Sequence, residues 1–225
     1  MYKLLIFDWD GTLIDSQARI IASMQTAAEE LGHEPLGSEA VRNIIGLGLP
    51  EAIRALIPSI EDPAMEQLRE RYAHHFLVQN DTPTELYPGV EKTLHRLKEQ
   101  GYRLAVATGK SRRGLDRALE QTRLGPLFEI TRCADETRSK PDPLMLHQIL
   151  AETGTPASDA IMVGDTEYDL DMGTRAGVGT VAVSYGAHHL DRLRGHKPLT
   201  EIHHFPELEL WLEELTVAMN QRTVS

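Results

Sequence analysis

The sequence predicts a doubly wound α/β protein with a parallel sheet at its core and a helical insert near the N-terminus. Five short apolar runs have the length of buried strands, at residues 4–7, 104–107, 128–131, 160–163 and 180–183. From residue 104 onward these runs alternate with helical patterns at the spacing of βαβ units. We therefore expect a Rossmann-like parallel sheet of at least five strands with helices on both faces.

The helical patterns between the strands have recognisable ends. An apolar stripe in residues 90–97 stops before Gly101, and another in residues 146–150 stops near Gly154. Glycine is typical of the position that follows a helix. A last stripe in residues 206–217 predicts a helix close to the C-terminus.

Residues 16–84 interrupt the alternation of strands and helices. Ile20 and Met24 belong to the apolar face of an amphipathic helix, for which Asp15 or Ser16 is the expected cap. Three shorter helical patterns follow, around residues 41–45, 53–57 and 65–76. We expect residues 16–84 to form an α-helical domain, and residues 1–15 and 85–225 to form the α/β core.

Composition narrows the classes of function. The formal net charge of −11 argues against a broad nucleic-acid surface, and the sequence contains no apolar stretch long enough to cross a membrane. The single cysteine, Cys133, excludes an internal disulfide framework. No signal peptide is visible, so we expect a cytoplasmic protein. We expect its partner to be a small molecule. The sequence does not indicate the oligomeric state. Three adjacent histidine pairs lack the spacing of a zinc site and are expected on the surface, at residues 74–75, 188–189 and 203–204.

The residues that follow the strands are the candidates for chemistry. Asp8 and Asp10 end the first apolar run, and such close carboxylates raise each other's pKa unless a cation or a proton-transfer role compensates. Other polar side chains follow later runs: Thr108, Lys140, Asp165 and Asp169. Ligands of open α/β sheets bind beyond the carboxyl ends of the strands, so we expect this set to meet at one edge.

This set suits phosphoryl transfer. Asp8 can act as a nucleophile, and Asp10 can protonate the leaving oxygen and then deprotonate the attacking water. Thr108 and the N–H groups of Gly109 and Lys110 can hold phosphate oxygens, and Lys140 supplies a compact positive charge for the nucleophile and the phosphate. A hard divalent cation with oxygen ligands would neutralise the carboxylates.

Simpler roles remain open for several residues. Thr108 alone could be only a helix N-cap, and Lys140 alone could be a solvated lysine before a proline turn. We expect Trp9 to point into the core. A solvated helix face is expected for Arg112, Arg113 and Arg117.

The ordered motifs resemble those of the haloacid dehalogenase superfamily of phosphohydrolases. They are Asp8-Trp9-Asp10-Gly11-Thr12-Leu13, then Thr108, then Lys140, then Asp165 with Asp169. The resemblance implies Mg²⁺ held by the Asp8 side chain, the Asp10 main-chain carbonyl and the Asp165 side chain, with Asp169 in support. The insert resembles the small α-helical cap of the phosphoglycolate phosphatase and β-phosphoglucomutase branch. That branch implies hydrolysis of a small phosphate monoester through an aspartyl-phosphate, with 2-phosphoglycolate as the default substrate.

Three alternatives stay open. A phosphomutase would need the insert to hold a sugar bisphosphate, whereas a haloalkanoic acid dehalogenase does not need an acid or base at the position of Asp10. A phospho-accepting signalling module would need a long-lived acyl phosphate. Arg42 and Arg54 are candidates to meet a substrate carboxylate.

Overall fold

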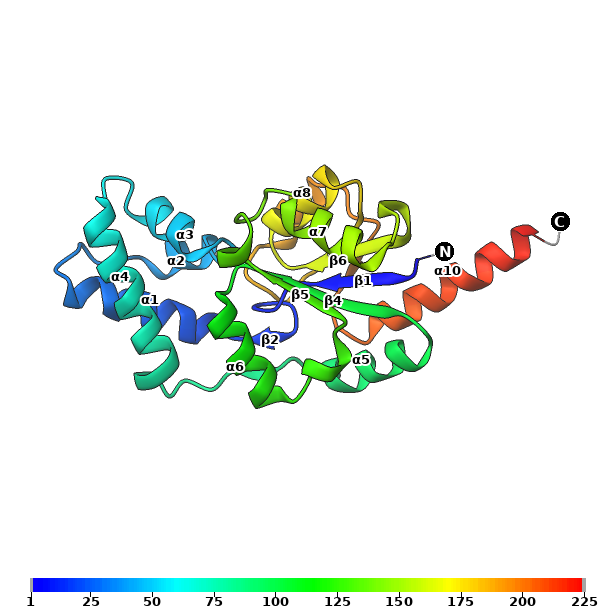
Figure 1. The fold of residues 1–225 in the computed structure, drawn as a ribbon, viewed down its shortest axis with the longest axis horizontal. Helices are drawn as coiled ribbons and strands as arrows, with labels where there is room; N and C mark the ends of the chain where they lie inside the picture. The colour runs from blue at the N-terminus through cyan, green and yellow to red at the C-terminus, as the bar shows by residue number, and fades with distance from the viewer. Residues whose placement is uncertain (1, 224–225) are drawn as a thin grey trace.

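A six-stranded parallel sheet forms the centre of the molecule (Figure 1). The computed structural model describes residues 2–223, and the side chains of residues 2–218. The strand order is β5-β4-β1-β6-β7-β8. Their bounds are β1 Leu4–Phe7, β4 Arg103–Thr108, β5 Ile130–Cys133, β6 Ala160–Gly164, β7 Gly179–Val183 and β8 Thr200–Ile202. Because β1 pairs with β4 on one side and β6 on the other, the carboxyl ends of three central strands meet at one edge.

Helices cover both faces of the sheet, as predicted. Leu5 and Phe7 of β1 face the layer that contains α5 (Val90–Glu99), α6 (Arg112–Thr122) and α10 (Glu207–Thr223). Leu4 and Ile6 face the layer of α7 (Leu144–Thr153) and α8 (Glu167–Arg175). This arrangement confirms the predicted fold class, since β1 is fully buried on both sides.

Two strands differ from the prediction. The third predicted strand begins at Ile130 rather than Phe128, because a short 3₁₀ turn at Gly125–Leu127 delays it. Phe128 instead packs its ring edge-on against Trp9, which points into the core as expected. The sixth strand was not predicted, because β8 has only three residues and no apolar run.

The C-terminal helix α10 confirms the predicted stripe and extends beyond it, from Glu207 to Thr223. Leu208 and Leu212 bury their side chains against the sheet layer. In the described part of the chain, the model contains no helix with the length and apolar character required to cross a membrane.

Residues between β2 and β3 form the helical insert, which lies at the opposite end of the molecule from α10 (Figure 1). It contains α1 Gln17–Glu30, α2 Ser38–Asn43, α3 Leu49–Leu56, α4 Asp62–His74 and the π-helical turn η1 His75–Gln79. The helices bury an apolar cluster of their own, centred on residues such as Met24, Ile53 and Leu68. The two connections lie side by side, because β2 (Ile14–Asp15) pairs antiparallel with β3 (Glu85–Leu86). The exact domain boundaries stay a prediction.

Candidate active site

Three buried carboxylates meet at the carboxyl edge of the sheet. Asp8 follows β1, Asp165 follows β6, and Asp169 lies in the first turn of α8. One carboxylate oxygen from each lies within 4.8 Å of the others. The structure therefore brings these three predicted residues together.

Lys140 bridges two of these carboxylates. Its Nζ lies 2.6 Å from Asp8 Oδ1 and 2.6 Å from Asp169 Oδ1, and the side chain is fully buried. Burial alone would lower the pKa of Lys140, but the charges of Asp169 and Asp8 keep it above its ordinary value. Lys140 is thus a fixed cation in the site and not a solvated lysine. It lies in a turn before α7 rather than at the start of that helix.

Asp169 already has partners on both oxygens. Oδ1 binds Lys140, and Oδ2 accepts hydrogen bonds from Thr166 Oγ1 at 2.7 Å and from the Thr166 backbone N–H at 3.1 Å. Gly164 lets this carboxylate approach, since a Cβ there would lie 2.3 Å from Asp169 Cβ. This geometry suits a residue that positions Lys140.

Asp165 is held from two sides. Thr12 Oγ1 donates to Oδ1 at 2.9 Å, and the Ala187 backbone N–H donates to Oδ2 at 2.7 Å. Gly11, with a φ of +84°, approaches so closely that a Cβ would lie 2.2 Å from Asp165 Oδ2. Burial and the neighbouring charge of Asp169 raise the pKa of Asp165 to about 7.

Asp8 has the fewest partners of the three carboxylates. Among the described residues, neither oxygen makes a hydrogen bond of good geometry, although Lys140 forms the close ion pair. Burial raises the pKa of Asp8 well above its ordinary value, while the charge of Lys140 opposes that rise. An orphaned buried carboxylate beside a second one is a donor set that fits a hard divalent cation, which prefers oxygen ligands.

Asp10 turns to a different pair of partners. Ser16 Oγ donates to its Oδ1 at 2.6 Å, and Lys110 Nζ lies 3.1 Å from Oδ1 and 3.0 Å from Oδ2. Lys110 also lies over the ring of Phe76, 4.7 Å from the centroid. Neither side-chain contact was predicted from the sequence. Ser16, one of the two expected caps, occupies the N-cap position of α1, but its hydroxyl makes no capping hydrogen bond and donates to Asp10 instead.

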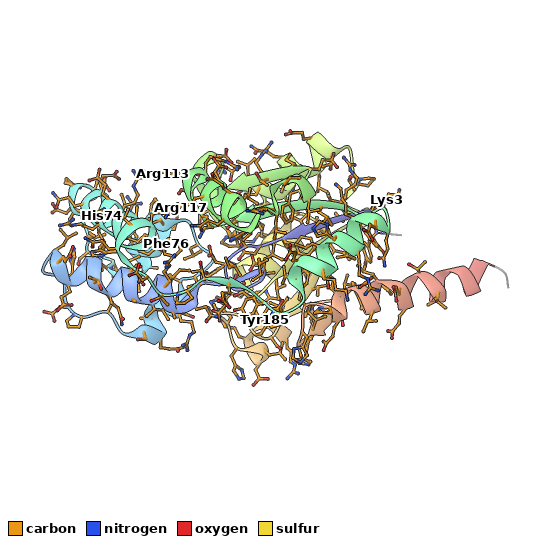
Figure 2. The ribbon with its side chains drawn as sticks, turned by 90° about the horizontal axis from the view of Figure 1, so that it is seen from below. Lys3, His74, Phe76, Arg113, Arg117 and Tyr185 are labelled. Carbon is orange, nitrogen blue, oxygen red and sulfur yellow. The ribbon has the colours of Figure 1, made fainter. Side chains whose placement is uncertain are left out.

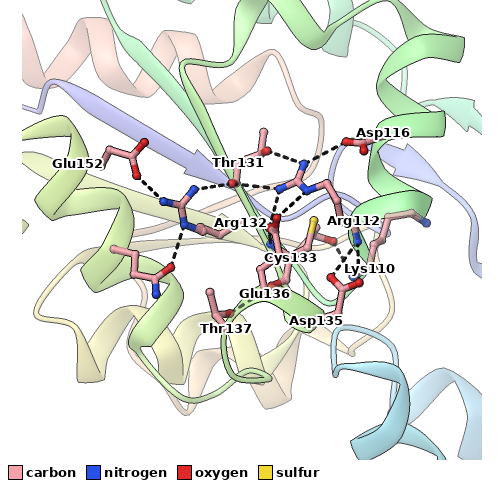
Figure 3. Close-up of polar contacts among 12 residues, drawn as sticks. Lys110, Arg112, Asp116, Thr131, Arg132, Cys133, Asp135, Glu136, Thr137 and Glu152 are labelled. Atoms are coloured by element: carbon pink, nitrogen blue, oxygen red, sulfur yellow. Dashed lines mark hydrogen bonds and ion pairs between the residues drawn. The ribbon is translucent and has the colours of Figure 1, made fainter.

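The loop after β4 is fixed to its neighbours. Thr108 Oγ1 accepts a hydrogen bond from the Lys110 backbone N–H at 3.2 Å. Arg112, at the start of α6, binds Glu136 at 2.7 Å and Thr131 Oγ1 at 2.9 Å (Figure 3). The expectation of a solvated Arg112 is therefore wrong. Its hydrogen bond to Thr131 attaches the candidate phosphate loop to β5, and its ion pair with Glu136 attaches the loop to the turn that follows.

The insert closes over this loop. The Gly48 backbone N–H donates to Ser139 Oγ at 2.7 Å, and Tyr168 Oη donates to the Asn43 carbonyl at 2.9 Å. A Cβ on Gly109 would lie 2.5 Å from the carbonyl oxygens of Gly46 and Leu47. Between the insert and the carboxylates lies a cavity of about 120 Å³ that includes Asp8, Asp10 and Thr108 in its lining.

The close approach of Gly109 to the backbone of Gly46 and Leu47 gives a first prediction. Gly109→Ala should lower kcat/KM about 10²-fold by displacing the insert from the site, because misplacement by about 1 Å can cost that much. The melting temperature should stay unchanged, since the clash involves only the Gly46–Leu47 backbone and not the sheet. Gly125→Ala is the matched control, because a Cβ there lies 3.8 Å from the nearest atom. Equal activity of the two variants would show that close approach at Gly109 is not needed.

Two expectations about surface groups are wrong. Arg42 and Arg54 do not line the cavity: they form ion pairs on the exterior with Glu39 at 2.9 Å and Asp62 at 2.8 Å. His75 and His188 are buried rather than solvated. His75 Nε2 lies 3.0 Å from Glu30, and His188 Nδ1 accepts the Glu167 backbone N–H at 3.1 Å. The described residues contain no histidine cluster suited to a metal.

Comparison with known proteins agrees with the geometry. The model of the haloacid dehalogenase-like hydrolase family matches residues 5–183, so the chain belongs to that family. A phosphoglycolate phosphatase of Pseudomonas savastanoi pv. phaseolicola is 34% identical over 194 residues, which are 83% of this chain and 71% of that protein. A phosphoglycolate phosphatase of Aliivibrio fischeri is 31% identical and covers 87% of this chain and 90% of its own length. Family and relatives together identify the chain as a phosphoric monoester hydrolase.

Solved structures show the same fold. A hydrolase from Pseudomonas syringae superimposes with a TM-score of 0.85 at 23% identity, over 95% of this chain and 99% of that one. At this identity, the likeness supports the architecture and leaves the substrate to the site itself.

Proposed function

We propose that the protein is a Mg²⁺-dependent phosphatase that hydrolyses a small phosphate monoester through an aspartyl-phosphate on Asp8. The observation that carries this proposal is the buried Asp8 carboxylate, which lines the cavity and has no contact closer to a hydrogen bond than its ion pair with Lys140. A nucleophile has to keep its lone pairs free for the substrate, whereas a purely structural carboxylate is normally hydrogen-bonded.

The two leading carboxylates divide the chemistry. An oxygen of Asp8 attacks phosphorus and the ester bond breaks, while Asp10 gives a proton to the departing oxygen. Water then attacks the phosphorus of the acyl phosphate, Asp10 takes its proton, and Asp8 is released as a carboxylate. Ser16 and Lys110 hold Asp10 in place through these steps.

The other site residues bind and orient. Thr108 and the Gly109 N–H are placed to hold phosphate oxygens, and Lys140 balances the charge on Asp8. Mg²⁺, when bound by Asp8, Asp165 and the Asp10 main-chain carbonyl, would offset the negative charge of carboxylate and phosphate. Asp169 supports the site by positioning Lys140.

We also propose that residues 16–84 act as a cap that opens for the substrate and closes for the reaction. Their apolar cluster includes, within residues 2–218, a single buried residue of the α/β core, Ala187, which favours movement as a unit, and we expect the hinge near residues 15–16 and 86–88, next to the β2–β3 pair. Closure excludes water while the phosphoryl group is transferred. The size of the closed cavity favours a small ester, and the names of the relatives make 2-phosphoglycolate the first to test. We expect the protein to work in the cytoplasm.

Metal dependence tests the proposal. Phosphate release from para-nitrophenyl phosphate should require Mg²⁺ and stop in excess chelator. Asp165→Asn should raise the Mg²⁺ concentration for half-maximal activity by more than about 100-fold, because loss of a direct ligand exceeds the roughly 10–100-fold effect of losing an outer partner. Asp169→Asn, the matched control, should lower kcat while leaving this concentration almost unchanged, because both Asp169 oxygens are already bonded. Full activity in chelator, or equal shifts in the two variants, would contradict the assignment.

A further inference from the structure

The wall that the insert presents to the cavity is apolar. The insert residues that line it carry only hydrocarbon, thioether or aromatic side chains, apart from a glycine and the hydroxyl of one tyrosine. Prominent among them are Ile20, Met24, Ile44, Leu49, Tyr72 and Phe76. The part of the substrate beyond the phosphate must therefore contact an apolar surface.

Among the described residues, no unpaired cation lines this cavity. The charged residues of the lining are Asp8, Asp10 and Lys110, and the Lys110 ammonium is bonded to both oxygens of Asp10. Arg19 lies outside the lining, in an adjoining hollow; it donates to the Asn80 carbonyl and packs against Phe76, and its Nε has no hydrogen-bond partner in the described part of the chain. A second carboxylate on the substrate would enter this space without a partner, which is costly in apolar surroundings.

A wider cleft of about 580 Å³ shares Leu49, Leu77 and Gly109 with the cavity and contains side chains of both charges, including Arg113. Figure 2 shows His74 on the insert and Arg113 on α6, which both belong to the lining of this cleft. A long substrate could extend a polar end into it. The carboxylate of 2-phosphoglycolate cannot do so, because one methylene separates it from the ester oxygen.

We propose, on the basis of the phosphatase function above, that the substrate is the phosphate ester of a short aliphatic or aromatic alcohol. The group next to the ester oxygen is apolar, and a carboxylate at that place is rejected. Size agrees with this class: an apolar cavity of about 150 Å³ binds benzene, and the 120 Å³ here also holds the phosphoryl group. The leaving group is therefore small.

A matched pair of esters tests the proposal on the unmodified protein. Propyl phosphate and 2-phosphoglycolate have similar lengths, and beyond the methylene on the ester oxygen they differ in an ethyl group against a carboxylate. We expect kcat/KM with Mg²⁺ to favour propyl phosphate by at least about tenfold, since burying an unpaired charge is strongly disfavoured. From methyl to propyl phosphate, kcat/KM should rise roughly fourfold per added methylene. Equal or better hydrolysis of 2-phosphoglycolate would overturn this inference and leave the phosphatase assignment intact.

Hydrolysis of para-nitrophenyl phosphate tests the phosphatase function separately from the preference for an apolar leaving group. If it is not hydrolysed either, the proposed function fails, and the inference fails with it. If it is hydrolysed but neither small ester is, the inference alone is overturned.

A change in the wall gives a second, independent test. Leu47 is half-buried in the lining, so Leu47→Lys should fold and place a cation in the cavity. It should reduce the preference for propyl phosphate at least about fivefold, whereas the uncharged control Leu47→Gln should weaken both esters alike. Thermal melting checks that both variants are folded. An unchanged preference in folded Leu47→Lys would show that this wall does not select the leaving group.

Discussion

Asp8→Asn should abolish phosphate release, because the amide cannot displace an alkoxide to form an acyl phosphate. The side chains are nearly the same size, and the charge of Lys140 remains balanced by Asp169 at 2.6 Å. The variant should therefore fold and keep the cavity. Phosphate release and covalent labelling by para-nitrophenyl phosphate should both fall below detection.

Asp62→Asn is the matched control for that experiment. The Asp62 side chain is 83% exposed at the start of α4, pairs with Arg54 on the exterior and does not line the cavity. It should retain full activity. Undiminished turnover in Asp8→Asn would show that the nucleophile has been assigned to the wrong residue.

Asp10→Asn should slow hydrolysis of an alkyl phosphate by about 10²–10⁴-fold, the usual contribution of general acid–base catalysis. The loss should depend on the leaving group. Para-nitrophenolate departs without a proton, so the first transfer to Asp8 should remain fast with that ester, while hydrolysis of the acyl phosphate becomes slow. Rapid-quench measurement of a para-nitrophenol burst would show this separation. An equal loss of the first transfer with both esters would argue against proton transfer by Asp10.

The convergence of the site could be predicted because it depends on topology. Asp8 and Asp165 each follow a strand and Thr108 is the last residue of one, and parallel strands bring their carboxyl ends to one edge whatever their exact register. The place of Asp169 could be predicted too, because it lies in the first turn of the helix after β6, and that turn faces the same edge. Strand β8 was missed because three residues at the sheet border carry too little pattern.

The partners within the site could not be predicted in the same way. Lys110 reaches Asp10 from 100 positions away through a flexible side chain, and only the closed fold determines its direction. Ser16 had a local alternative as a helix cap, which the tertiary contact with Asp10 replaces. Arg42 and Arg54 were expected at the substrate because their charge suits a carboxylate, but each has an acidic neighbour on the exterior. Tertiary packing determines which of these partners a side chain binds. The spacing of residues along the chain does not report that packing.

The covalent step on Asp8 is the central claim, and one measurement tests it most directly. Asp10→Asn protein, mixed with para-nitrophenyl phosphate and Mg²⁺ and quenched in acid, should carry a phosphoryl group that peptide mapping assigns to Asp8. The acyl phosphate should accumulate there because the base for its hydrolysis is missing. Phosphate on any other residue, or continued phosphate release with no covalent phosphate on the protein, would contradict the mechanism.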